Sequence, residues 1–283
     1  MDGIIGGRYQ VLSKLGQGKF GIVYQGRNIS TDQSVAIKTE TIGSPIRLLK
    51  NETTVLKYLY DQGCRCCPIV YWYGIHLDTT CLVFSRYTIS LYDYLHIKPL
   101  ENEKKKAIMR TCIGMLESIH QHFVIHRDIK PENFMIRDGE LFLIDFGFAT
   151  FYIDPDGEHI ADIITEDLTG TPKYISYNIH CGHTASRRDD MISLGYIFLW
   201  ILNGELPWTE GRSPSNSSHR ELSLENENHI LHPLNVYRKD KKSLNMLENL
   251  ISNYNGLYRY LEHCYRLNYE GSPLYGELEK LFG

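Results

Sequence analysis

The sequence HRDIKPEN, residues 126–133, places an acid, a cation and an amide on one short loop that follows an apolar segment. Asp128 can accept the proton of an incoming hydroxyl group, and Lys130 can neutralise charge on a moving phosphoryl group. Asn133 can hold a divalent metal through its side-chain oxygen. These residue types at this spacing predict a loop that supports phosphoryl transfer.

A second candidate site follows twelve residues later, where the sequence DFG occupies residues 145–147. The four residues before it, LFLI, are all apolar and predict a short buried strand. Asp145 is therefore expected at the exit of a strand. Carboxylate and amide oxygens suit Mg²⁺, so Asn133 and Asp145 are the candidate metal ligands.

A glycine-rich stretch near the start of the chain, GQGKFGIV, covers residues 16–23. A Cβ atom at Gly16, Gly18 or Gly21 would obstruct the approach of backbone N–H groups to phosphate oxygens, or the conformation of the loop. The pattern alone is weak evidence, because it also opens dinucleotide-binding units and occurs in ordinary hairpin turns. The flanking residues 10–15 and 22–26 predict the two strands of a hairpin.

Together with VAIK at residues 35–38, these motifs occur in the order and spacing of the protein-kinase family, which the chain resembles. The resemblance implies ATP and Mg²⁺ as cofactors and an α+β, two-lobed fold. The expected single domain spans residues 1–283, with a β-rich lobe to about residue 84, a hinge at about 85–90 and a helical lobe from about 91. The implied ATP-contacting residues are Leu15, Gly16, Gln17, Gly18, Lys19, Phe20, Gly21, Val23, Ala36, Lys38, Glu52, Phe84 and Asp145.

Lys38 lies in an apolar strand, where a buried lysine is costly unless an acid pairs with it. The segment 48–59 has helical periodicity and carries Glu52, which is the predicted partner. Alternatively, Glu52 is a solvated carboxylate on the helix surface. Glu40 is the other nearby acid that could pair with Lys38, but it comes too early in the sequence.

In its second half the chain resembles the casein kinase 1 group, through residues 168–176 and 186–196. That group replaces the usual Ala-Pro-Glu triplet with a Ser-Ile-Asn-like one, and residues 176–178 read Ser-Tyr-Asn here. The resemblance implies a serine/threonine kinase, with Asp128 as base and Lys38, Lys130 and Asn133 also catalytic. Asp190 is expected to bind the backbone of the catalytic loop. A catalytically weak kinase-fold scaffold and a kinase for small molecules remain as alternatives.

The same group commonly prefers substrates that are acidic or already phosphorylated. Segment 145–172 of this chain holds seven Asp or Glu residues and no Lys or Arg. Lys173, Arg187 and Arg188 are the candidate ligands for a substrate anion, because a guanidinium suits phosphate geometry. Arg188 is alternatively structural.

Composition fits this interpretation. With 283 residues and 42% hydrophobic residues, the chain can bury a large core. The net charge of −4 argues against a nucleic-acid partner. The start of the chain shows no secretion signal. The longest apolar run, residues 191–202, is too short to span a membrane and predicts a buried helix. We therefore expect an intracellular protein, cytoplasmic or nuclear, with no membrane partner, and we expect it to be a monomer. Seven cysteines predict reduced thiols, and the cluster at residues 64–67 is either a metal site or a packed loop.

Overall fold

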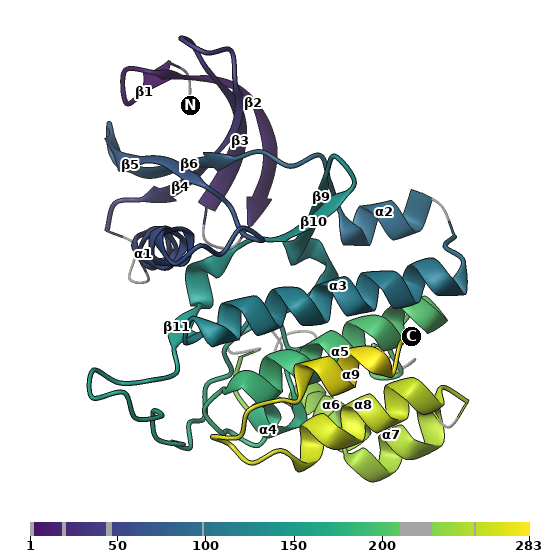
Figure 1. The fold of residues 1–283 in the computed structure, drawn as a ribbon. Helices are drawn as coiled ribbons and strands as arrows, with labels where there is room; N and C mark the ends of the chain where they lie inside the picture. Colours follow the sequence, from purple (N-terminus) through teal and green to yellow (C-terminus); the bar gives the residue numbers. More distant parts are fainter. Residues whose placement is uncertain (1–2, 19–20, 44–46, 98, 210–227, 252) are drawn as a thin grey trace, which may run out of the picture. The chain divides into compact units, whose positions relative to one another are not determined.

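The computed structural model describes residues 3–18, 21–43, 47–97, 99–209, 228–251 and 253–283 (Figure 1). Two compact units are present: Met1–Tyr94 with Glu132–Ala149, and Leu95–Pro131 with Thr150–Gly283. Residues 132–149 belong to the first unit because they form strands that pair within it, whereas a division near residue 90 would assign them to the helical lobe. The boundaries expected for the β-rich lobe, the hinge and the helical lobe therefore remain predictions.

The first unit is built on a six-stranded antiparallel sheet. In sheet order its strands are β1 (Ile4–Ile5), β2 (Tyr9–Gly18), β3 (Gly21–Asn28), β4 (Ser34–Thr41), β6 (Thr79–Ser85) and β5 (Val70–His76). Strands β2 and β3 are the hairpin that the sequence predicts around the glycine-rich stretch. The predicted residues Lys19 and Phe20 are outside the described residues.

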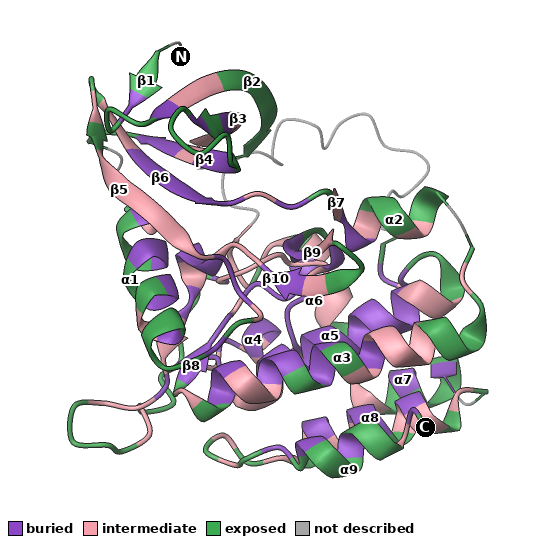
Figure 2. Cartoon of the chain, turned by 45° about the horizontal axis from the view of Figure 1, so that its top comes forward, coloured by how far each residue is buried: buried purple, intermediate pink, exposed green. Residues whose placement is uncertain are grey.

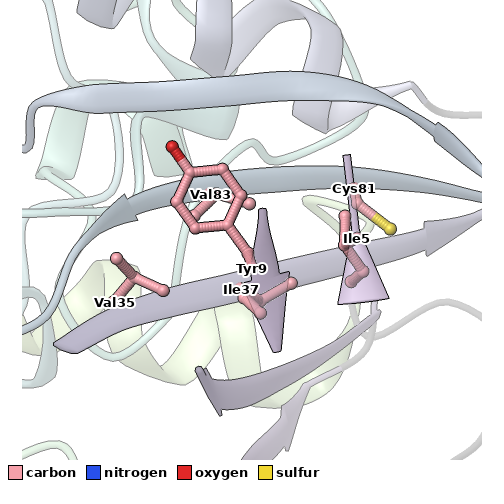
Figure 3. Packing of buried hydrophobic residues seen from close by; sticks show 6 residues of the cluster. All are labelled: Ile5, Tyr9, Val35, Ile37, Cys81 and Val83. Atoms are coloured by element: carbon pink, nitrogen blue, oxygen red, sulfur yellow. The ribbon is translucent and has the colours of Figure 1, made fainter. Parts of the chain in front are cut away.

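One face of this sheet carries a core of six buried residues, which Figure 3 shows in close view. They come from β1, β2, β4 and β6, so the short first strand is held by side-chain packing as well as by its ladder. The members are Ile5, Tyr9, Val35, Ile37, Cys81 and Val83. Burying such residues is the main favourable contribution to the stability of the sheet.

The only long helix of the first unit's described part, α1 (Leu48–Asp61), covers another part of the sheet. Its apolar residue Leu49 packs with Ala36, Leu82 and Phe84 in a second cluster. Glu40, at the end of β4, is 5% exposed, and its carboxylate accepts a hydrogen bond from the backbone N–H of Leu48 at 3.0 Å. An acid at this point satisfies a free N–H of the first turn and complements the helix dipole. The rival acid Glu40 thus anchors the start of α1.

A smaller antiparallel sheet completes the first unit, in the order β10 (Glu140–Leu143), β9 (Phe134–Arg137) and β7 (Ile89–Ser90). Phe134 pairs with Leu143, and the backbone N–H of Ile144 donates to the carbonyl oxygen of Asn133 at 2.8 Å. The 3-10 turn η2 (Phe146–Phe148) follows. This hairpin places Asn133 and Asp145 at the same end of two paired strands.

The second unit is mainly helical, and the fold class α+β is therefore confirmed. The helix α2 (Leu91–Ile97) and the 3-10 turn η1 (Pro131–Asn133) each extend over a boundary between the units. The other elements are α3 (Asn102–Gln121), β8 (Val124–Ile125), β11 (Thr150–Phe151), α4 (Tyr177–His180), α5 (Arg187–Asn203), α6 (Pro233–Lys241), α7 (Leu244–Ile251), α8 (Asn255–Arg266) and α9 (Tyr275–Lys280).

Helix α5 is the centre of this unit, and every residue from Asp189 to Trp200 is buried (Figure 2). This confirms the prediction that the longest apolar run is a buried helix. Among the residues that the structure describes, no helix is both long and apolar enough to cross a membrane.

Asp189, in the first turn of α5, is buried and holds the Ser-Tyr-Asn triplet. Its Oδ1 accepts hydrogen bonds from the Ser176 hydroxyl at 2.5 Å and the Asn178 amide at 3.1 Å. Its Oδ2 accepts from the backbone N–H of Ser186 at 2.8 Å. The triplet therefore fixes the segment before α4 to the start of α5 through hydrogen bonds to one carboxylate.

A second buried polar group lies under residues 172–175. Lys242, which is 0% exposed, donates to the carbonyl oxygens of Pro172 at 3.0 Å and Ile175 at 2.7 Å. Its Nζ lies 3.1 Å from Nε2 of His180, a hydrogen bond that cannot form if both groups are protonated. Burial, followed by repulsion from Lys242, lowers the pKa of His180 to about 2.

This pKa shift predicts a pH-dependent stability. In the unfolded chain His180 titrates near its ordinary pKa of about 6.5, so between pH 2 and 6.5 the unfolded chain binds a proton that the folded chain does not. The free energy of unfolding should therefore fall as the pH drops below 6.5, by about 2 kcal/mol from pH 6.5 to 5. His180→Gln should remove most of this slope in urea unfolding, whereas His76→Gln on β5 should retain it. Equal slopes for the wild type and His180→Gln would contradict this assignment.

The cysteine cluster lies in the loop after α1. The Sγ atom of Cys64 is 3.4 Å from Sγ of Cys66 and 3.9 Å from Sγ of Cys67. None of the seven cysteines forms a disulfide bond. No group of three metal-binding His, Cys, Asp or Glu side chains is found in the described part of the chain. Two of the three thiols are buried, which favours the packed-loop interpretation.

Candidate active site

A cavity of about 430 Å³ lies in the first unit, a size that suits a small organic ligand. Eight of the predicted ATP-contacting residues line it: Leu15, Gly16, Val23, Ala36, Lys38, Glu52, Phe84 and Asp145. They come from β2, β3, β4, α1, β6 and the segment after β10. Phe84 lines the cavity and also belongs to the core cluster with Leu49, so the same side chain contributes to the pocket and to the core of the sheet.

The structural reason for glycine differs among the three predicted glycine positions. A Cβ atom on Gly16 or Gly18 would meet no atom of the described chain within 4 Å, so packing does not demand glycine there. At Gly21, with φ of +157°, a Cβ atom would lie 1.8 Å from the carbonyl oxygen of Thr39 on β4. Close approach of two strands, rather than a ligand, therefore explains Gly21. Gln17 is not a lining residue, and its side chain accepts a hydrogen bond from Lys14 at 2.6 Å.

Lys38 contacts two carboxylates within the cavity. Its Nζ lies 2.8 Å from Oε2 of Glu52 and 2.6 Å from Oδ1 of Asp145. Burial by itself lowers the pKa of Lys38, but the attraction of Glu52 and then of Asp145 outweighs it and leaves the pKa above its ordinary value. The cavity therefore contains a permanent cation held at a defined position. Glu52 is 2% exposed, so it is not a solvated carboxylate of the helix surface.

The two predicted metal ligands fit a hard cation. Asn133 is 4% exposed and offers an amide oxygen, and Asp145 offers a carboxylate that is only partly covered. Mg²⁺ is typically bound by one or two carboxylates together with substrate phosphates, and does not need a cage of protein ligands. Asp145 has a left-handed backbone, with φ of 65°, which is uncommon outside glycine and marks this residue as structurally constrained.

Nine further residues line the cavity, and four of them lie in the predicted hinge at about residues 85–90. The additional lining residues are Ser85, Arg86, Tyr87, Ser90, Tyr92, Asp93, Glu132, Met135 and Ile144. Met135 and Ile144 lie next to the predicted ligands Asn133 and Asp145 on the β9–β10 hairpin, so hairpin alternation could have identified them. In the predicted hinge, the backbone N–H groups of Ser85 and Thr88 donate to Ile69 and Ile136.

In the second unit, Asp128 forms a three-residue cluster. Its Oδ2 accepts a hydrogen bond from Lys130 Nζ at 2.6 Å, and its Oδ1 accepts one from the Thr171 hydroxyl at 2.7 Å. Lys130 Nζ also lies 3.1 Å from Thr171 Oγ1. Asp128 is 4% exposed, so the carboxylate is held in one orientation. Thr171 was not predicted, because its role depends on contact between segments that are 43 residues apart.

Asp190 fixes the backbone of the catalytic loop, as the sequence predicts. It accepts hydrogen bonds from the N–H groups of His126 at 2.7 Å and Arg127 at 2.9 Å. Burial alone would raise the pKa of Asp190, but its hydrogen bond with His120 and the attraction of His120 and His126 lower it. A Cβ atom on Gly170, whose φ is +100°, would lie 2.5 Å from the Arg127 carbonyl oxygen, so glycine allows this segment to pack on the loop.

The three candidate anion ligands have partners within the second unit. Arg187 donates to the Tyr152 hydroxyl at 3.2 Å and to the Glu270 carbonyl oxygen, and Arg188 donates to the Leu267 carbonyl oxygen at 3.1 Å. Lys173 Nζ lies 5.4 Å from the ring centre of Tyr174. Both arginines therefore hold the segment after α8, which supports the structural alternative for Arg188. A role in anion binding stays a prediction.

Comparison with known protein families matches residues 9–258 to the protein kinase domain. The chain belongs to the protein kinase family. It is also similar to casein kinase I homolog 1 of Schizosaccharomyces pombe (strain 972 / ATCC 24843), with 31% identity over 291 aligned residues that cover 99% of this chain. The chain spans 61% of the length of that relative. The resemblance to the casein kinase 1 group is thereby confirmed.

Proposed function

We propose that the protein transfers the γ-phosphoryl group of ATP to serine or threonine hydroxyls of proteins. The observation that carries this proposal is the contact of Lys38 with Glu52 and Asp145, because it places a fixed cation beside a metal-binding carboxylate in a cavity of suitable size. Protein kinases in general use ATP and Mg²⁺, and the residues present here fit both.

Within the cavity, each group has a separate proposed role. The apolar residues Val23, Ala36 and Phe84 would contact adenine, and the peptide groups of the hinge at Arg86 and Tyr87 would form hydrogen bonds with it. Lys38 orients the α- and β-phosphates, and Glu52 holds Lys38 in place. The open space around Gly16 and Gly18 allows backbone N–H groups to approach the phosphates. Mg²⁺ bound by Asn133 and Asp145 would neutralise phosphate charge.

Asp128 is the proposed base for the substrate hydroxyl. The hydrogen bonds from Lys130 and Thr171 orient its carboxylate. The hydrogen bonds that the N–H groups of the two preceding residues donate to Asp190 fix the backbone before it. The hydroxyl proton passes to Asp128 as the new oxygen–phosphorus bond forms. The bond between the γ-phosphorus and the β,γ-bridging oxygen breaks, ADP leaves with that electron pair, and Lys130 stabilises charge on the transferred group. Lys130 favours serine or threonine over tyrosine, because tyrosine-specific kinases usually lack a lysine at this place.

The test is a set of three peptides that are identical except for Ser, Thr or Tyr at one acceptor position. With Mg²⁺-ATP, the protein should phosphorylate the Ser and Thr peptides and leave the Tyr peptide unmodified. Phosphorylation of the Tyr peptide at a comparable rate would contradict the proposed specificity. Binding of Mg²⁺-ATP without any transfer would favour the scaffold alternative.

A further prediction concerns the acidic segment 154–167. Asp162 pairs with His183 at 2.8 Å and Glu166 with His229 at 3.3 Å, whereas Asp156 is exposed. We expect basic residues in the substrate to be tolerated near this segment and a phosphorylated residue to help less than in the relatives. Like-charge repulsion should disfavour acidic residues, most strongly at low salt, where it is screened least. This preference is measured with peptides that differ only in having phosphoserine, Asp, Ala or Lys at one upstream position. Each peptide is assayed at two salt concentrations. A large phosphoserine preference that Lys173→Ala abolishes would contradict it.

Protein substrates are thus the proposed partners. The predicted monomeric state, the absence of nucleic-acid and membrane partners, and the cytoplasmic or nuclear location stay predictions.

A further inference from the structure

Asn51 on helix α1 forms two hydrogen bonds with the backbone that follows Asp145. Its Nδ2 donates to the carbonyl oxygen of Gly147 at 3.0 Å and to that of Ala149 at 2.8 Å. A side-chain amide nitrogen has two hydrogens, so both donors are used. The residue itself is exposed, which means that hydrophobic burial does not account for an asparagine at this place.

The same face of α1 touches this segment at a second point. A Cβ atom on Gly147 would lie 3.2 Å from Cβ of Leu48, which is tight contact. Helix α1 is itself held at Leu48 by the Glu40 carboxylate and at Glu52 by Lys38. The helix is therefore a fixed support, and Asn51 joins it to the backbone of η2.

Asp145 needs such support because of its conformation. Its φ and ψ are both 65°, in the left-handed region that residues with a Cβ rarely occupy. Lys38 holds the Asp145 side chain at 2.6 Å, but a side-chain contact does not fix the backbone on the C-terminal side. The two bonds from Asn51 reach the second and the fourth residue after Asp145, where they restrain that backbone.

We propose that Asn51 is a positioning residue that keeps the Asp145 carboxylate in the orientation that binds Mg²⁺-ATP. The proposal rests on the proposed function for the identity of the ligand. The two N–H groups of one side-chain amide on α1 hold the backbone that follows the proposed metal-binding aspartate. Asn51 does not line the cavity, so its effect should be confined to the metal and the phosphates and should spare adenine.

Two variants and two ligands test this proposal. Asn51→Asp is nearly isosteric but replaces both donors by an acceptor that faces two carbonyl oxygens, and Asn51→Leu removes the donors without adding charge. Thr54→Val on the same helix is the matched control, because the Thr54 hydroxyl bonds only to Lys50 within α1 among the hydrogen bonds described. Calorimetry measures the Kd of Mg²⁺-ATP, and the Kd of adenosine reports on the cavity without metal or phosphate.

We expect Asn51→Leu to weaken Mg²⁺-ATP binding roughly tenfold, as the loss of two neutral hydrogen bonds predicts, and Asn51→Asp to weaken it more. Adenosine binding should change by less than about twofold in both variants, since neither removes a cavity residue. As the pH falls, the Mg²⁺-ATP affinity of Asn51→Asp should rise relative to that of Asn51→Leu measured at the same pH. The reason is that a protonated Asp side chain can donate one hydrogen bond.

Wild-type affinity for Mg²⁺-ATP in both variants would overturn the proposal. Equal losses for adenosine and Mg²⁺-ATP would also overturn it, because they would show a general change of the cavity. These measurements need no phosphoryl transfer. If the wild type binds Mg²⁺-ATP but phosphorylates no protein, the proposed function fails while the role of Asn51 is still decided by binding.

Discussion

Asp128→Asn should abolish phosphoryl transfer while Mg²⁺-ATP binding stays at the wild-type level. The amide has no basic oxygen for the hydroxyl proton, and it cannot accept from Lys130 and Thr171 as the carboxylate does. A positioned acid–base group usually contributes about 10²-fold or more to the rate. Asp128 does not line the nucleotide cavity, so the Kd of Mg²⁺-ATP should not change. A phosphotransfer assay and calorimetry measure the two effects separately.

The matched control is Asp138→Asn, in the turn between β9 and β10. Asp138 is 92% exposed and pairs only loosely with Arg137 at 3.8 Å, so its neutralisation should leave turnover unchanged. If Asp128→Asn retained more than about a tenth of wild-type turnover, the assignment of Asp128 as the base would be wrong.

Asp145→Asn should impair both binding and turnover. The substitution removes one of the two carboxylates that contact Lys38 and the proposed charged ligand of Mg²⁺. We expect Mg²⁺-ATP affinity to fall at least about tenfold, because charged contacts of this kind contribute about 1.5–3 kcal/mol. Turnover should fall further, by about 10²-fold or more, whereas adenosine should bind as it does to the wild type.

The contribution of the metal is measured separately by determining nucleotide affinity at a series of Mg²⁺ concentrations. In the wild type the affinity should rise with Mg²⁺, and in Asp145→Asn this rise should be largely lost. An unchanged Mg²⁺ dependence would show that Asp145 is not a ligand. Asp32→Asn provides a control, since its 83% exposed side chain pairs with Arg27 at the surface.

The sequence was sufficient for features that depend on local order. The glycine hairpin, the helix that carries Glu52, and the short strand before Asp145 all follow from periodicity and turn residues along one segment. The partner of Lys38 was also predictable, because a buried cation requires an acid and the periodicity of one helix turns Glu52 inward. Asp190 was predicted through family resemblance, and its bonds to the catalytic loop confirm that prediction.

Other features depend on contacts between distant segments that no local pattern encodes. Thr171 reaches Asp128, and Asn51 reaches Gly147, across separations of 43 and 96 residues. Glu40 came too early in the sequence to be the partner of Lys38, yet it anchors the helix that carries that partner. Arg187 is another example, because two of its donors bind a side-chain hydroxyl and a backbone carbonyl oxygen that folding brings to it. Its role as a ligand for a substrate anion stays a prediction.

The most direct test of the account is the transfer of labelled phosphate from [γ-³²P]ATP to casein by the wild-type chain. We predict Mg²⁺-dependent labelling that appears as phosphoserine and phosphothreonine after acid hydrolysis, and that is absent with Asp128→Asn. If a folded wild-type chain that binds Mg²⁺-ATP labels neither casein nor itself, the chain is a scaffold with a kinase fold, and the central claim is wrong.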